Sequence, residues 1–102
     1  AVLRALRALA HPPTAIFAAS DLQARAMVEA AQTLGLRVPE ELSVVGFDDI
    51  LLAEHAHPPL TTVRQELAQG AIKLVETVIA AIRGEKPEST TLAPILIVRA
   101  SA

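Results

Sequence analysis

The sequence contains no cysteine, no tryptophan and no tyrosine, and it has only two phenylalanines, Phe17 and Phe47. The missing cysteines exclude a disulfide framework and a thiolate metal site. The shortage of aromatic rings excludes the stacking platforms on which proteins hold unpaired nucleic-acid bases. A polar ligand would therefore be held mainly by hydrogen bonds.

An excess of positive charge is also absent, since nine lysines and arginines stand against eleven aspartates and glutamates. These residues offer no basic surface for sustained contact with phosphates, so nucleic acid is a poor partner for them. No apolar run approaches the roughly 20 residues of a membrane-spanning helix. Arg4 and Arg7 interrupt the first residues, which therefore do not form the apolar core of a signal peptide. We expect a soluble chain with no membrane partner.

Hydrophobic residues make up 52% of the 102 positions, which favours one folded core. A chain of this length can bury roughly 65% of its unfolded surface, and its composition excludes a disordered tail. Residues 2–9 have apolar side chains at helical spacing, but no capping residue precedes them. We therefore expect the chain to begin inside a helix, as a C-terminal fragment of a longer protein.

Short apolar segments alternate with longer helical patterns. Strands are predicted at 14–19, 42–47, 60–64 and 92–99, the last of them restricted by Pro94. Helices are predicted between the first two strands and over 66–83. The strand-helix-strand unit over 14–47 should have parallel strands. The order of elements predicts an α/β protein with a parallel sheet.

The two longer helices have recognisable ends and apolar stripes. Ser20 and Gln23 fit an S-x-x-Q capping box, and Gly35 and Gly84 are placed to end the helices. The stripe of the first helix comprises Leu22, Ala26, Ala30 and Leu34. The second helix should bury Ile72, Val75, Val78, Ile79 and Ile82.

Polar side chains directly follow the first two predicted strands. In open parallel sheets ligands bind outside the carboxyl ends of the strands, which here carry Ser20-Asp21 and Asp48-Asp49. Hydroxyl and carboxylate groups there are suited to hydrogen bonding with a sugar, polyol or heterocycle. Simpler roles are also open: Ser20 as a helix cap, Asp21 as a favourable charge in the first helical turn, and the acid pair as turn formers or caps of a short helix over 50–54.

Signals for catalysis or metal binding are weak. His55 and His57 form an H-x-H pair, but the chain does not visibly supply further ligands. The sequence has no nucleophile elbow, phosphate loop or zinc-protease motif, and an adjacent acid pair does not provide opposed groups for acid-base catalysis. Arg64 and Gln65 fit solvated or bridging polar groups. We expect no enzyme activity, no metal site and no cofactor.

Three segments, in order and spacing, closely resemble the C-terminal half of effector domains in the lactose-repressor and galactose-repressor family of bacterial transcription regulators. They are PTAIFAASD at 13–21, LGLRVPEELSVVGFDD at 34–49 and PPLTTVRQ at 58–65. The final helix and LAPILIVRAS at 92–101 also look like the ending of that family. The resemblance covers nearly the whole chain.

The resemblance implies a type I periplasmic-binding-protein-like fold, in which two α/β subdomains hold an effector in the cleft between them. About 1–59 and 92–102 would then belong to the C-terminal subdomain, and about 60–91 would be a strand and helix of the N-terminal one. The DNA-binding domain would be absent. By the same resemblance Asp48 matches an acid that contacts effector hydroxyls, and Ser20 matches a position often held by asparagine. The shorter serine without an amide indicates a different effector from that of members with asparagine.

The resemblance also implies partners. A small effector, such as a sugar or related polar metabolite, would control operator binding by an intact cytoplasmic homodimer. The helix after Asp21 and the segment 51–57 are the candidate self-association surface. A periplasmic sugar-binding protein of a transport system is the alternative, because it shares the fold; a signal peptide upstream would favour it, and a helix-turn-helix upstream would favour the regulator.

Overall fold

The computed structural model describes residues 2–102, which form two compact units. Unit 1 comprises residues 2–64 and 96–102, and unit 2 comprises residues 65–95. The chain leaves unit 1 after Arg64 and returns at Leu96. The subdomain boundaries expected from the resemblance, near 60 and 91, lie a few residues before the boundaries of these two units.

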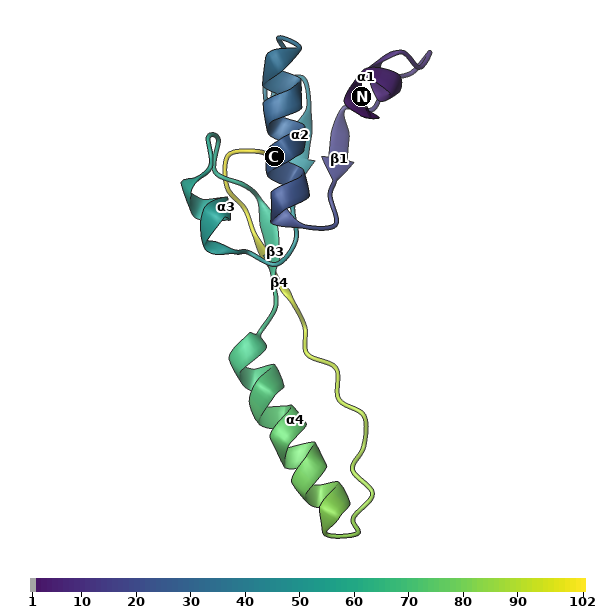
Figure 1. The fold of residues 1–102 in the computed structure, drawn as a ribbon, viewed down its shortest axis with the longest axis vertical. Helices are drawn as coiled ribbons and strands as arrows, with labels where there is room; N and C mark the ends of the chain where they lie inside the picture. Colours follow the sequence, from purple (N-terminus) through teal and green to yellow (C-terminus); the bar gives the residue numbers. More distant parts are fainter. Residues whose placement is uncertain (1) are drawn as a thin grey trace. The chain divides into compact units, whose positions relative to one another are not determined.

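Unit 1 contains the predicted strand-helix-strand arrangement (Figure 1). Its strands β1 (Ala15–Phe17) and β2 (Ser43–Val45) pair in parallel, with Ile16 opposite Val44. Helix α2 (Asp21–Thr33) connects the two strands and contacts β2. The parallel pairing predicted from the sequence is therefore confirmed.

The parallel arrangement continues toward the third strand. Val45 forms a parallel bridge with Thr61, and the amides of Gly46 and Asp48 donate to the carbonyls of Thr61 and Val63. Strand β3 (Thr62–Arg64) thus begins beside the carboxyl end of β2 and pairs on its other side with β4 (Ile95–Ile97). Helices α1 (Val2–Arg7) and α3 (Leu51–His55) complete the unit.

The C-terminal residues fasten β2 to β3. Ser101 is fully buried, its backbone carbonyl accepts from the amide of Val44 at 2.8 Å, and its hydroxyl accepts from the amide of Thr61 at 2.9 Å. The same hydroxyl donates to the carbonyl of Val44. Ser101 therefore supplies the hydrogen bonds that the edges of the two strands need where they are not directly paired.

Helix α2 packs through a different face from the one predicted. Its buried residues are Asp21, Ala24, Val28 and Ala31, whereas Leu22 is 61% exposed and Leu34 is 37% exposed. The buried alanines have small side chains, which allow the helix to approach the sheet closely. The core of unit 1 comprises Leu3, Ala18, Ala24, Val28, Ala31, Leu42, Val44, Ala53 and Leu60.

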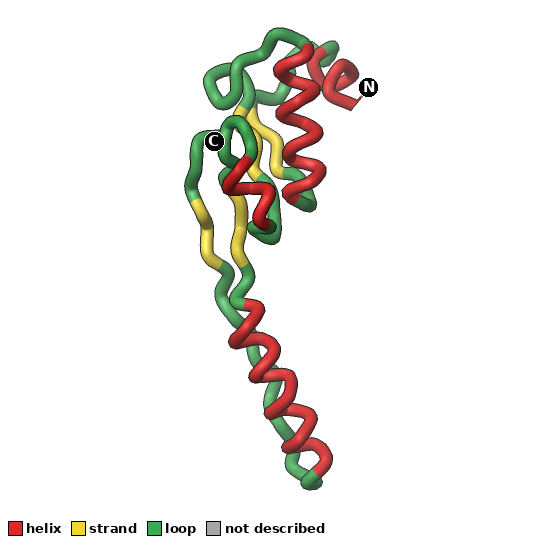
Figure 2. The backbone as a smooth tube through the Cα atoms, turned by 60° about the vertical axis from the view of Figure 1, so that its left-hand side comes forward, coloured by secondary structure: helices red, strands yellow, loops and turns green. Residues whose placement is uncertain are grey.

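Unit 2 consists of α4 (Leu67–Ile82) and an extended segment, 84–94, that runs back along it (Figure 2). The prediction of this helix is confirmed, but the prediction that its apolar stripe is buried was wrong. Among the described residues α4 buries none, and its stripe residues Ile72 and Ile82 are 60% and 79% exposed. The physical reason is that unit 2 contains no second layer that could cover an apolar helix face.

No helix in the described part of the chain, residues 2–102, is long and apolar enough to cross a membrane.

Candidate functional site

The turn after β2 has an unusual backbone. Asp48 has a φ of 101° and Asp49 a φ of 52°, values that L residues other than asparagine and aspartate seldom adopt. The amide of Asp48 donates to the carbonyl of Val63 at 2.9 Å, and Asp48 is exposed to solvent. The N-cap of α3 is Ile50, so neither acid occupies that position. The turn thus carries Asp48 to the surface at the carboxyl edge of the sheet.

Ser20 lies at the same edge, at the end of the segment that follows β1. It is half-buried and forms the N-cap of α2, with its hydroxyl accepting from the amide of Gln23 at 3.2 Å. The predicted cap is therefore confirmed. The next amide, that of Asp21, donates to the carbonyl of Phe47 at 3.1 Å. This hydrogen bond links the segments that follow β1 and β2. Ser20 and Asp48 are the sequence neighbours of the two bonded residues, so they lie on adjacent segments.

Asp21, which the sequence predicts as a third ligand contact, is buried, with only 1% of its surface exposed. Its Oδ2 accepts from the amide of Ile50 at 2.8 Å, and its Oδ1 accepts from the hydroxyl of Thr62 at 2.6 Å. Both carboxylate oxygens are therefore engaged by donors from the protein itself.

Asp49 forms two ion pairs. Its carboxylate, 7% exposed, contacts Arg64 Nε at 2.7 Å and Arg99 Nη2 at 2.8 Å. Burial of this carboxyl raises its pKa, but the hydrogen bonds from Arg64 and Arg99 and their charges outweigh burial, and the pKa of Asp49 is lowered. Arg64 is thus the bridging group that the sequence suggested, whereas the role of Arg99 has no local signal in the sequence.

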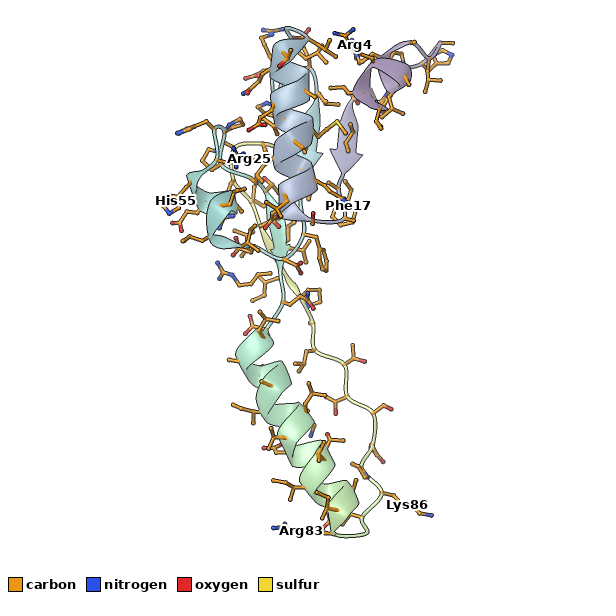
Figure 3. All side chains as sticks on the ribbon, in the orientation of Figure 1. Arg4, Phe17, Arg25, His55, Arg83 and Lys86 are labelled. Carbon is orange, nitrogen blue, oxygen red and sulfur yellow. The ribbon has the colours of Figure 1, made fainter. Side chains whose placement is uncertain are left out.

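Two aromatic rings flank the strand ends. Phe17 ends β1 and Phe47 follows β2, with ring centroids 6.4 Å apart and planes at 77°, an edge-to-face contact. Phe17 is 65% exposed (Figure 3). No role for these rings was predicted from the sequence, although Phe17 is the last residue of β1 and Phe47 is two residues beyond the end of β2.

A groove lies between α2 and α3, with a volume of about 590 Å³. Arg25 on α2 and His55 on α3 both line it (Figure 3). The remaining lining includes Val28, Leu51, Leu52, His57 and Leu60. Within residues 2–102 no cluster of three acids or histidines could hold a metal ion. His55 and His57 both line this groove, which has polar and apolar side chains.

The edge formed by Ser20 and Asp48 carries groups that can hydrogen-bond a polar ligand. A hydroxyl and a carboxylate can each hydrogen-bond a ligand hydroxyl, and a carboxylate does so with roughly twice the strength of a neutral acceptor.

Comparison with known proteins shows the family. The family model described as a periplasmic binding protein-like domain matches residues 1–102. The chain is 43% identical to the HTH-type transcriptional regulator DegA of Bacillus subtilis (strain 168) over 93 residues, 89% of this chain and 28% of that relative. It is 40% identical to the ribose operon repressor of Haemophilus influenzae over 91 residues, covering 87% and 27%.

The solved structures to which this chain is similar include transcriptional regulators of the same kind as the relatives found by sequence. The complex of the transcriptional regulator CelR with cellobiose superposes with a TM-score of 0.79 at 40% identity, covering 87% of this chain and 28% of that one. A LacI family transcriptional regulator from Bifidobacterium animalis subsp. lactis superposes with a TM-score of 0.92 at 31% identity, covering 98% and 37%. The chain spans less than a third of the length of the curated relatives named above. It belongs to the periplasmic binding protein-like domain family, in the form found in LacI-family transcriptional regulators.

Proposed function

We propose that this chain is part of the ligand-sensing domain of a LacI-type transcriptional regulator and that it contributes Asp48 and Ser20 to the site of a small effector. The exposure of Asp48 on a turn of positive φ, at the carboxyl edge of the sheet, carries the proposal. The proposed effector is a sugar or a related polar metabolite. Relatives of this chain support that class, since one structure holds cellobiose and others hold sucrose and glucose.

The proposed mechanism is allosteric and involves no bond cleavage. Unit 1 would belong to the C-terminal lobe and unit 2 to the N-terminal lobe, and an effector between the lobes would favour one closure over the other. An intact cytoplasmic regulator would transmit that difference to its operator-binding domain. The 102 residues of this chain have nine basic and eleven acidic side chains, so we do not expect this part of the regulator to contact the operator. The named relatives are regulators, which favours this role over that of a transport protein.

Changing Asp48 to asparagine tests the effector site. Asparagine tolerates the positive φ of this position and keeps the shape of the side chain, so Asp48→Asn removes little besides the charge. We expect affinity for the bound sugar to fall by about 1.5–3 kcal/mol, roughly 10- to 150-fold. Isothermal titration of the protein carrying this chain with glucose, sucrose and cellobiose would measure the change.

The matched control is Glu40→Gln, the same change of carboxylate to amide at an exposed residue that precedes β2. It should leave sugar affinity unchanged. A sugar that binds wild type and Asp48→Asn equally well would remove Asp48 from the site.

We propose in addition that the groove between α2 and α3 receives a second copy of the chain, which makes the regulator a homodimer. Leu51, which is 76% exposed, and buried Leu60 both line this groove. The mixture of exposed apolar side chains with Arg25 and His55 is typical of a protein interface. One LacI-type relative is described as a dimer on its operator.

Replacing Leu51 by aspartate should shift the protein from dimer to monomer, because an interface centre does not accommodate an unpaired carboxylate. Sedimentation velocity over a range of concentrations would measure the shift. Leu22→Asp is the control, since Leu22 on α2 is 61% exposed but does not line the groove. Persistence of the dimer in Leu51→Asp would move the interface elsewhere.

A further inference from the structure

We infer that Asp21 is a positioning residue, whose buried carboxylate holds the turn over 46–50 in the conformation that presents Asp48 to the effector. This inference rests on the proposed function and assigns a specific task to a side chain that does not itself reach the ligand. The mechanism is indirect, because Asp21 acts through the backbone of the turn and not through an atom of the sugar.

Asp21 binds the turn on both sides of the acid pair. Its backbone amide donates to the carbonyl of Phe47 at 3.1 Å, before the pair, and its Oδ2 accepts from the amide of Ile50 at 2.8 Å, after the pair. A single residue at the start of α2 thereby fixes the distance between the two ends of the turn. Only Asp48 and Asp49 lie between these two anchor points.

The turn needs such anchors because its backbone is strained. The φ values of 101° at Asp48 and 52° at Asp49 lie in a region that L residues rarely occupy. A conformation of this kind persists only where surrounding contacts determine it, and it is typical of ligand-binding segments. Releasing one anchor should let the turn relax and carry the carboxylate of Asp48 away from its position.

Thr62 of β3 completes the arrangement. Its hydroxyl donates to Asp21 Oδ1 at 2.6 Å and accepts from the amide of Asp49 at 3.4 Å. Both Asp21 and Thr62 are buried, at 1% and 0% exposure. The helix, the turn and the third strand are thus linked through one carboxylate and one hydroxyl, a supporting layer beneath the exposed residues of the site.

A helix-capping role does not account for this geometry. Ser20 already caps α2 through the amide of Gln23. A negative charge in the first turn favours the helix dipole from an exposed position equally well. Burial of Asp21 against the turn is needed only if its oxygens serve the turn and β3, which is what the two hydrogen bonds show.

The test combines amide exchange with sugar titration in the protein carrying this chain. In Asp21→Asn the amide of Ile50 should exchange roughly tenfold faster relative to the amide of Gln23, because a charged acceptor has become a neutral one. Binding of whichever of glucose, sucrose and cellobiose the wild type takes should weaken by a similar factor. Thr62→Val should reproduce both effects, and Thr62→Ser, which keeps the hydroxyl, should restore both.

A double-mutant cycle separates positioning from general stability. If Asp21 acts through Asp48, the Asp21→Asn change should cost less than about twofold in sugar affinity when Asp48 is already asparagine. If the loss of sugar affinity in the double variant equals the product of the losses in Asp21→Asn and Asp48→Asn, the inference is overturned. It is also overturned if the exchange rate of the Ile50 amide is unchanged in both Asp21→Asn and Thr62→Val. If none of the three sugars binds the wild type, the proposed effector class fails, and the exchange rates alone support or overturn the anchoring of the turn.

Discussion

Replacing Gly46 by alanine is expected to destabilise the fold by about 3 kcal/mol, at the upper end of the cost of overpacking a core. A Cβ at this position would lie 2.2 Å from Asp21 Oδ1 and 3.2 Å from both the Cβ of Ala24 and the Cα of Asp21. The carboxylate cannot move aside without breaking its hydrogen bonds to Ile50 and Thr62. Helix α2 would therefore have to shift away from the sheet.

Urea unfolding followed by circular dichroism would measure the change, with Gly70→Ala as the control. Gly70 lies inside α4, where a Cβ would find only Leu92 Cδ1 at an ordinary 3.6 Å. Alanine there should be neutral or stabilising by about 0.5–1 kcal/mol, because glycine is a poor helix former. Equal stability of wild type and Gly46→Ala would show that α2 and Asp21 are not held as closely over Gly46 as the structure places them.

Replacing Asp49 by asparagine is expected to destabilise the fold by about 2–3 kcal/mol. The carboxylate is 7% exposed, and its removal leaves the guanidinium of Arg99, 16% exposed, without its charge partner. Removing one member of a buried pair is costly because the other charge stays desolvated. The contribution of Arg64 is smaller, since its side chain is 49% exposed and solvent screens it. Asparagine also tolerates the φ of 52°, so backbone strain should not add to the loss.

The effect of Asp49→Asn should depend on pH in a defined direction. Because the pKa of Asp49 is lowered in the folded state, the ionised carboxylate contributes stability above its ordinary pKa of 3.8 and loses that contribution as the pH falls through the folded-state value. The difference in unfolding free energy between wild type and Asp49→Asn should therefore be constant between about pH 5 and 8 and shrink below about pH 4. Urea titrations at several pH values would measure it.

The exposed pair of Arg37 and Glu41 provides the control for this pH series. The pKa of Glu41 is also lowered, first by the hydrogen bond from the Arg37 amide and then by the one from its side chain. Glu41→Gln should nevertheless leave the melting temperature nearly unchanged, because solvent screens both partners. A difference for Asp49→Asn that does not shrink in acid would mean that the ion pairs are not its cause.

The order and type of the elements in unit 1 were predictable from the sequence because their signals are local. The apolar run at 14–19, the cap at Ser20 and the apolar run at 42–47 each depend on residues within one element. Parallel pairing followed from the length of the connection, since a helix must return the chain to the same end of the sheet. The family resemblance was also readable, because its motifs are contiguous segments.

Burial on the helix faces was not predictable in the same way. Spacing alone does not distinguish one helical face from its neighbour. Helix α2 turns Asp21 and Ala24 toward the sheet, where Gly46 lies opposite them at close range. The stripe of α4 has the right period, but burial depends on a partner layer, which unit 2 does not contain.

Only the tertiary structure decides which of the three aspartates is exposed and which contacts each of the others makes. By position alone, Asp21, Asp48 and Asp49 are carboxylates that closely follow a strand, and only the family resemblance distinguishes Asp48. The positive φ of the turn exposes Asp48 and directs Asp49 toward Arg99, fifty positions further along the chain, while Asp21 meets Thr62 from another strand. The sequence alone therefore determined the family, the elements and the edge of the sheet where the polar groups gather. Which carboxylate faces solvent depends on side-chain directions and on partners distant in sequence, and no local pattern records these.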